Sequence, residues 1–281
     1  MSGKAKVAGI IGWPVAHSLS PALHGFWLAA HNVDGAYVPM AVRREDFSRV
    51  LEGLRSAGFK GVNLTVPHKE AGFALAHEAD DAAREAGAVN LLVFENGKIK
   101  GRNTDSIGLA ASLREAQIAL TGETAVLLGA GGAARAAVLA LDALGAKEIR
   151  ILNRNVSRAE AMAASLAPKI RARPTVHALT DWPRVTGDAK LLLNATSAGM
   201  SGYDLLNLNL DALSKDAAVC DIVYNPLETD LLKRAKARGL KTVDGLGMLM
   251  HQAVSAFEAF YGVTPKVTLE LRHHLEAALK Q

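Results

Sequence analysis

Cysteine is almost absent from this chain of 281 residues, in which Cys220 is the single example. One cysteine excludes a disulfide within the chain and any zinc site built from several cysteines. This composition suits a reducing compartment, so we expect a cytoplasmic protein.

Long apolar runs are lacking as well, and nothing approaches the roughly 18 residues that a transmembrane helix needs. Lys4 and Lys6 precede a short apolar run, but Gly12 and Pro14 interrupt it too early for a signal peptide. The net charge is +4, with lysine and arginine scattered rather than clustered, and no nucleic-acid recognition motif is present. This charge pattern suits a small anionic ligand at least as well as a nucleic acid. We expect no membrane, nucleic acid or metal as partner. We also expect a monomer or homodimer, which the composition does not decide.

Residues 124–155 contain the clearest motif of the chain. An apolar run over 125–128 is typical of a strand buried on both faces, and an alanine-rich segment with strong helix propensity follows it. Between them, G-x-G-x-x-A is spelled by Gly129, Gly131, Gly132 and Ala134. A second strand over 149–152 completes a βαβ unit, which makes the motif a dinucleotide-binding fingerprint rather than a tight turn alone. We expect pyrophosphate at Gly129, Ala130, Gly131, Gly132 and Ala133, because glycines let it approach the backbone and the helix N-terminus offers N–H groups.

The end of the second strand distinguishes NAD from NADP. An NAD enzyme usually has a carboxylate there for the ribose 2′-hydroxyl, whereas an NADP enzyme needs a cation for the 2′-phosphate. This chain has Asn153, Arg154 and Asn155, with Arg158 close behind. The pattern favours NADP, with a solvated surface arginine as the alternative.

The N-terminal part alternates between strand and helix patterns, which indicates an α/β domain. In an extended segment Ser18 and Ser20 would point the same way and could bind a carboxylate, although Ser20 before Pro21 is also a helix start. Further on, Asn63 and Thr65 share one face of a strand, just before Lys69. A lysine there is either functional or a solvated charge.

A helix is predicted over 70–86, with Asp80 and Asp81 inside it. Asn96-Gly97 then lies between two apolar-alternating runs, the signal of a two-residue hairpin turn. If Glu95 faces Lys98, Asn90 faces Asn103, and Asp105 lies diagonally within reach on the same face. Either these polar groups meet a polar ligand or the hairpin end lies in water.

The C-terminal part continues as a doubly wound sheet. A strand over 191–194 ends in small polar residues, as expected at the ligand-binding edge. Another strand, over 218–224, ends at Asn225-Pro226. Met248 and Gln252 fall on one helix face, and the amide needs a polar partner if it is buried.

Taken in order, these motifs resemble the shikimate dehydrogenase family of NADP-linked 3-dehydroshikimate reductases. The resemblance runs from about residue 9 to residue 253 through H-S-x-S-P, N-x-T-x-P-x-K, G-A-V-N, N-T-D, D-x-V-Y-x-P and D-G-x-G-M segments. It implies a substrate domain over 1–105, completed by 245–281, and a Rossmann-like NADP-binding domain over 106–244. The implied substrate is a small anionic cyclohexene carboxylate.

The resemblance also implies roles for individual residues. Lys69 is the implied catalytic acid/base and Asp105 its partner. The implied substrate contacts are Ser18, Ser20, Asn63, Thr65, Asn90, Tyr224 and Gln252. Besides the glycine loop and Asn153, Arg154, Asn155 and Arg158, the implied cofactor contacts are Gly245 and Met248.

The chain departs from the family pattern at Gly25, where asparagine is common, and at Leu91, where threonine is common. Asn155 replaces a usual threonine, but its amide still offers a donor. The first two departures keep open a sister dehydrogenase acting on quinate or an aminated ring. The motifs also leave open a non-catalytic sensor on the same fold and an unrelated NADP-binding protein.

Overall fold

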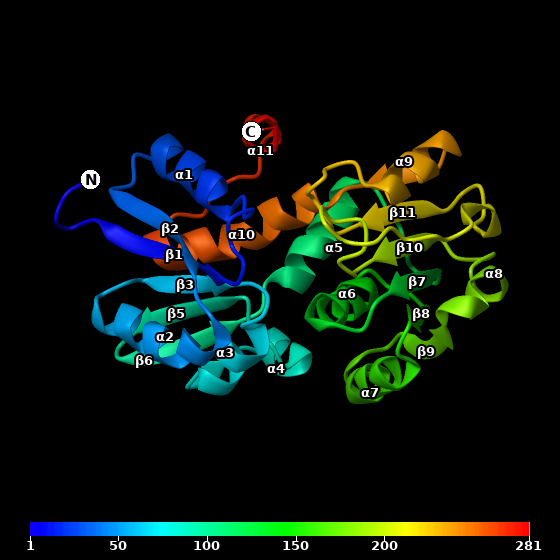
Figure 1. The fold of residues 1–281 in the computed structure, drawn as a ribbon, viewed down its shortest axis with the longest axis horizontal. Helices are drawn as coiled ribbons and strands as arrows, with labels where there is room; N and C mark the ends of the chain where they lie inside the picture. Colours follow the sequence, from blue (N-terminus) through cyan, green and yellow to red (C-terminus); the bar gives the residue numbers. More distant parts are fainter. Residues whose placement is uncertain (281) are drawn as a thin grey trace. The chain divides into compact units, whose positions relative to one another are not determined.

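The computed structural model describes residues 1–280 and has an α/β fold (Figure 1). Contacts divide the chain into two compact units, one made of residues 1–104 and 252–281 and the other of residues 105–251. Residue 105 and residues 245–251, which the sequence analysis assigned to the substrate domain, fall in the second unit. Helices explain both differences: Asp105 begins helix α5 (Asp105–Glu115), and the division falls within helix α10 (Gly245–Tyr261).

The first unit contains a mixed sheet in the order β2-β1-β3-β5-β6-β4. Its strands are β1 (Lys6–Gly12), β2 (Gly35–Ala41), β3 (Gly61–Leu64), β4 (Glu78–Ala79), β5 (Leu91–Glu95) and β6 (Lys98–Arg102). Its helices, besides the end of α10, are α1 (Ser20–Ala30), α2 (Phe47–Ser56), α3 (Lys69–Leu75), α4 (Asp81–Ala86) and α11 (Leu269–Ala278).

The predicted hairpin between β5 and β6 is confirmed, including its register. Glu95 pairs with Lys98, and Asn96 and Gly97 take φ values of 51° and 73°, as a type I′ turn requires. Ladder pairing ends at Leu91 and Arg102, and Asp105 starts a helix. The extrapolation of strand geometry to Asp105 was therefore wrong.

The single helix predicted over 70–86 was also wrong. Helix α3 ends at Leu75, the short strand β4 follows, and α4 starts at Asp81. Asp80 is the N-cap of α4, since its carboxylate accepts a hydrogen bond from the Ala83 N–H at 2.7 Å. An aspartate stabilises a helix start in this way better than it stabilises a helix interior, which explains the break.

The first unit has an aliphatic cluster and an aromatic cluster. The aliphatic cluster includes Ile11, Leu51, Val62, Leu64 and Leu92. The aromatic cluster joins α1, β2 and α10 through His24, Trp27, Tyr37, Phe257 and Phe260. In it the rings of His24 and Tyr37 stack with centroids 3.9 Å apart.

The second unit contains an all-parallel sheet in the order β9-β8-β7-β10-β11-β12. Numbered within the unit this is 3-2-1-4-5-6, the order of a dinucleotide-binding doubly wound sheet. Its strands are β7 (Thr124–Leu128), β8 (Glu148–Asn153), β9 (Arg173–Ala178), β10 (Leu191–Asn194), β11 (Ala218–Asp221) and β12 (Lys241–Val243). Its further helices are α6 (Gly132–Ala143), α7 (Val156–Leu166), α8 (Trp182–Val185) and α9 (Asp230–Ala237).

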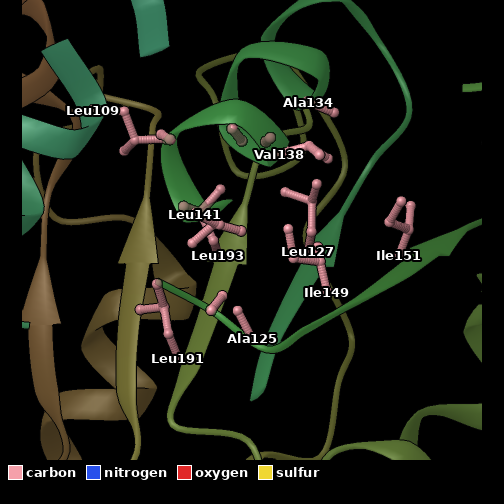
Figure 2. Packing of buried hydrophobic residues seen from close by; sticks show 14 of the residues in the cluster. Leu109, Ala125, Leu127, Ala134, Val138, Leu141, Ile149, Ile151, Leu191 and Leu193 are labelled. Carbon is pink, nitrogen blue, oxygen red and sulfur yellow. The ribbon is translucent and has the colours of Figure 1, made fainter. Parts of the chain in front are cut away.

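Helices cover both faces of this parallel sheet, as the buried strands require. Ala125 and Leu127 of β7 pack with α5, α6 and α7, and Figure 2 shows this cluster between strands and helix. The alternate residues Val126 and Leu128 pack against Trp182 and helix α9 on the other face. The alternation explains why β7 is apolar at every position after Thr124. Within residues 1–280, no helix is long and apolar enough to cross a membrane.

Candidate active site

The glycine loop between β7 and α6 lies next to the point where the strand order reverses, between β7 and β10. Gly129 has a φ of 110°, and a Cβ added there would lie 3.0 Å from the Thr196 side chain and 3.1 Å from the Ala195 carbonyl oxygen. An added Cβ on Gly132, by contrast, would meet nothing within 4 Å. Gly129 is therefore needed for the turn itself, whereas Gly132 leaves open space at the start of the helix.

The N-terminus of α6 fits a bound phosphate group. Gly131 is the N-cap of this 12-residue helix. Because glycine has no side chain, the N-cap residue provides no side-chain acceptor for the first N–H groups. These donors, the helix dipole and the space beside Gly132 suit the pyrophosphate of a dinucleotide.

The four polar residues at the end of β8 and just beyond it take different roles. The Arg158 guanidinium donates to the Ala130 carbonyl at 3.0 Å, which ties α7 to the glycine loop. Asn155 caps α7 by accepting from the Arg158 N–H at 3.0 Å, and Asn153 donates to the Asn155 carbonyl at 2.7 Å. Arg154 is exposed to solvent, while the other three form hydrogen bonds within the turn or to the glycine loop.

Ser18 and Ser20 lie in a turn that leads into α1, and the extended segment expected for them is not found. The Ser18 N–H donates to the Val15 carbonyl at 3.0 Å, and the Ser20 N–H donates to the Ser18 hydroxyl oxygen at 3.3 Å. Ser20 is buried as the first residue of α1, and its hydroxyl bonds to Tyr37. Burial raises the pKa of Tyr37 well above its usual value, so this phenol stays protonated and donates.

Asn63 is held at both ends of its amide. Its Oδ1 accepts from the Tyr37 hydroxyl at 2.8 Å, and its Nδ2 donates to the Asn90 carbonyl at 3.0 Å. Thr65 follows β3, and its N–H donates to the Ile11 carbonyl at 3.0 Å. Tyr37 was not singled out from the sequence, because an aromatic residue in a strand is usually a packing residue.

Asn90 and Gln252 meet directly, although 162 residues separate them. The Asn90 Nδ2 donates to Gln252 Oε1 at 2.8 Å and to the Thr104 hydroxyl oxygen at 2.9 Å. Asn103, which the hairpin register placed opposite Asn90, instead donates to the Ala88 carbonyl at 2.9 Å. The residue of this segment that bonds to the Asn90 side chain is thus Thr104, one residue further along.

Lys69 and Asp105 both sit at helix starts, Lys69 at α3 in the first unit and Asp105 at α5 in the second. The Lys69 carbonyl accepts from the Val89 N–H at 3.0 Å, which anchors the start of α3 beside the segment that contains Asn90, just before β5. Asp105 is buried. Among the described residues no group of histidine, cysteine, aspartate and glutamate has the geometry to hold a metal ion.

The remaining predicted residues lie after β11 and in α10. Tyr224 is half-buried three residues beyond β11. A Cβ on Gly245 would collide with the Ile222 carbonyl, so close packing alone already requires glycine there. Met248 is half-buried and packs against the cluster around β7.

A buried polar network at the ends of β10 and β11 was missed from the sequence. Asp221 accepts from Asn194 at 2.9 Å, from the Val223 N–H at 3.0 Å and from the Thr229 hydroxyl at 2.8 Å. Burial raises the pKa of Asp221 to about 6. Asn194 Oδ1 in turn accepts from the Thr196 hydroxyl at 2.7 Å, beside Gly129. An aspartate at the end of an apolar strand was the available signal.

Comparison with known proteins agrees with this arrangement. A family model described as the shikimate dehydrogenase substrate binding domain matches residues 10–92, and one described as shikimate / quinate 5-dehydrogenase matches residues 110–223. A shikimate dehydrogenase (NADP(+)) of Rhodospirillum rubrum is 49% identical over 275 residues, which cover 97% of each chain.

Solved structures are similar over the same length. A shikimate dehydrogenase in complex with NADP+ has 34% identity and a TM-score of 0.93, over 100% of this chain and 98% of that one. The quinate dehydrogenase of Corynebacterium glutamicum in complex with NAD has 31% identity and a TM-score of 0.88, over 99% of both chains. The chain therefore belongs to the shikimate dehydrogenase family.

Proposed function

We propose that this protein catalyses the reversible NADP-dependent reduction of 3-dehydroshikimate to shikimate in aromatic amino acid biosynthesis. The observation that carries the proposal is the likeness, at nearly full length, to a relative named as an NADP(+) shikimate dehydrogenase. The family membership makes the chain an oxidoreductase. Residues with suitable chemistry for cofactor and substrate are present in both units.

The proposed cofactor contacts lie in the second unit. Backbone N–H groups of the loop from Gly129 to Ala133 would hold the pyrophosphate, and the Arg154 guanidinium would bind the 2′-phosphate. Asn153, Asn155 and Arg158 would shape this pocket, since each already bonds within the turn. Gly245 and Met248 complete the proposed set. When bound, NADPH supplies the hydride.

The proposed substrate contacts lie mainly in the first unit. Ser18 and Ser20 would bind the carboxylate with hydroxyl and backbone donors. Asn63, Thr65, Asn90 and Gln252 would bind ring hydroxyls, and Tyr224 of the second unit would contribute a phenol. Support comes from the burial of these side chains. Burying a polar group costs free energy unless the group bonds to a polar ligand or belongs to a hydrogen-bond network.

Lys69 is the proposed acid/base. Reducing a ketone places negative charge on its oxygen, and a positioned ammonium can donate the required proton. In the reverse direction the free amine accepts the proton of the substrate hydroxyl. We assign Asp105 to holding the lysine and the reacting hydroxyl in line.

We also propose that residues 1–105 with 245–281 form the substrate-binding half and residues 106–244 the NADP-binding half. The protein would act in the cytoplasm, where its buried Cys220 stays reduced, as a monomer or homodimer. Light scattering on the purified protein measures the oligomeric state directly.

The test is a panel of shikimate, quinate and aminoshikimate with NADP+ or NAD+, followed at the nicotinamide absorbance. We expect turnover with shikimate and NADP+ to exceed every other combination. Preference for quinate with NAD+ would replace the proposal with the activity named for the Corynebacterium glutamicum relative. Binding of shikimate without turnover would instead favour a sensor.

A further inference from the structure

The hydrogen bonds around Asn90 have directions that the chemistry fixes. The Thr104 backbone N–H can only donate, and it does so to Asn90 Oδ1 at 2.9 Å. The other end of the Asn90 amide is therefore Nδ2, which can also only donate. One backbone group thus determines which way the Asn90 side chain faces.

The direction passes from Asn90 to Gln252. The Asn90 Nδ2 needs an acceptor, so the atom of Gln252 at 2.8 Å must be Oε1. The closest acceptor for the Thr104 hydroxyl hydrogen is the Gln252 main-chain carbonyl at 3.0 Å, and the hydroxyl oxygen accepts from Asn90 Nδ2 at 2.9 Å. Thr104 thereby bonds both to the Asn90 side-chain amide and to the main chain of Gln252.

The free end of Gln252 follows from this arrangement. Its oxygen is used by Asn90, and in the described part of the chain the structure gives no acceptor for its Nε2. Gln252 is half-buried, whereas Asn90 and Thr104 are each about 3% exposed. The Thr104 hydroxyl also lies 3.3 Å from Gln252 Oε1, so two donors already face this oxygen. The end of the Gln252 amide left for a ligand is therefore the Nε2 donor.

We propose that Thr104 is a positioning residue that fixes the Gln252 amide with its NH2 toward the substrate, so that the substrate group there must accept a hydrogen bond. The inference rests on the proposed function for the identity of the substrate. A hydroxyl oxygen, carbonyl or carboxylate meets this requirement. An ammonium group, which can only donate, does not.

Kinetics of a double-mutant cycle test the coupling. Thr104→Val keeps the shape and the backbone N–H but removes the hydroxyl, and we expect KM for shikimate to rise about 5- to 10-fold, the effect of one hydrogen bond, with kcat and the KM of NADP+ little changed. Thr104→Ser should restore KM. In a Gln252→Ala background the effect of Thr104→Val should fall to about 1-fold, because the residue it acts through is gone. An equal effect in both backgrounds would overturn the proposal.

A ligand-free measurement separates this inference from the proposed function. In the side-chain amide region of a ¹⁵N NMR spectrum, the Asn90 Nδ2 hydrogens should exchange slowly with water and the Gln252 Nε2 hydrogens quickly. Thr104→Val should speed exchange at Asn90, and Thr104→Ser should not. Slow exchange at Gln252 Nε2 in the free protein would contradict the donor assignment, whether or not the protein turns over shikimate.

A second variant tests the selectivity. Gln252→Glu keeps one oxygen for Asn90 and replaces the donor by an acceptor. We expect this variant to weaken shikimate binding while it improves the ratio of aminoshikimate to shikimate binding, measured by calorimetry. An unchanged ratio would contradict the proposed selection.

Discussion

The candidate substrate half-site in the first unit and the candidate cofactor half-site in the second unit differ in the groups that form them. In the first unit, polar side chains from β3, the ends of the β5–β6 hairpin and α10 hold one another through Asn63, Asn90, Thr104 and Gln252. In the second unit, the site is mostly backbone, with glycine where a Cβ would interfere and an uncapped helix N-terminus. The first half-site thus depends on which groups are present, and the second on which groups are absent.

This difference suits the two proposed ligands. A ring carrying several hydroxyls needs donors and acceptors at fixed positions, which only side chains with fixed amide directions supply. A pyrophosphate carries charge on many equivalent oxygens, so a set of N–H groups at a helix end is sufficient. Removing a polar side-chain group should therefore weaken substrate binding in the first unit. Adding a side chain at a glycine should weaken cofactor binding in the second.

The largest effect is expected at Lys69. Lys69→Met keeps much of the length of the side chain but removes the proton donor, so kcat should fall by about 100-fold or more, with a smaller effect on substrate KM. Steady-state rates with shikimate and NADP+ measure this. Lys60→Met is the matched control, because Lys60 is an exposed lysine just before β3. Retention of most activity in the Lys69 variant would remove the assigned role.

Most of the proposed cofactor contacts in the second unit are backbone groups, whereas Arg154 would act through its side chain. Arg154→Ala tests this side-chain contact. Loss of a charge-assisted bond to the 2′-phosphate should raise KM for NADP+ by about 10- to 100-fold and leave KM for NAD+ nearly unchanged. Arg184→Ala serves as control, since Arg184 is exposed and paired with Asp181 in the same unit. If the NADP+ preference survives in the Arg154 variant, the 2′-phosphate must be bound elsewhere.

Two glycine variants separate folding from binding in the second unit. Gly129→Ala should cost about 1–3 kcal/mol of stability, because alanine tolerates a φ of 110° poorly and its Cβ meets Thr196 and Ala195. Gly132→Ala should leave the free energy of unfolding unchanged or improved, yet raise KM for NADP+, because the methyl group would occupy the space left for phosphate. Thermal unfolding and NADP+ titration check both. Equal NADP+ affinity in Gly132→Ala and wild type would argue against a phosphate there.

The two units should also respond to pH in opposite directions. His24 is buried among aromatic rings, and burial lowers its pKa to about 3. A depressed histidine pKa contributes stability above about pH 6.5 that is lost as pH falls, so the first unit should lose about 2 kcal/mol between pH 7 and 5. Burial raises the pKa of Asp221 to about 6, so its contribution is full below about pH 4 and is lost as pH rises through 6.

Hydrogen exchange of amides in each unit, at pH 5 and pH 7, measures these responses. His24→Phe keeps a ring in the aromatic cluster and should flatten the response of the first unit. Asp221→Asn keeps the shape of the carboxyl group and should flatten that of the second. A response that persists in either variant would assign it to other groups.

Local patterns predicted much of the fold. The glycine motif and the apolar run before it gave the strand, loop and helix of the second unit, since each depends on residues close in sequence. The hairpin register followed from Asn96-Gly97 for the same reason. The break of the predicted 70–86 helix could have been expected from Asp80, but a capping residue and an exposed helical aspartate look alike until the backbone is known.

The contacts between distant segments could not be predicted. The resemblance placed Asn90 and Gln252 at one ligand, but only the fold shows that they bond to each other through a network that includes Thr104. Tyr37 was likewise missed, since its hydrogen bond to Asn63 depends on β2 and β3 lying on either side of β1 in the sheet. Side-chain direction across 162 residues is a property of packing, which local spacing does not contain.

The most direct test is separate NMR titrations of the labelled protein with shikimate and with NADP+. We predict that shikimate alone shifts the side-chain amides of Asn63, Asn90 and Gln252, and that NADP+ alone gives its largest shifts at the backbone amides from Gly129 to Ala133. Shikimate shifting the glycine loop most, or leaving the three amides unmoved, would contradict the account.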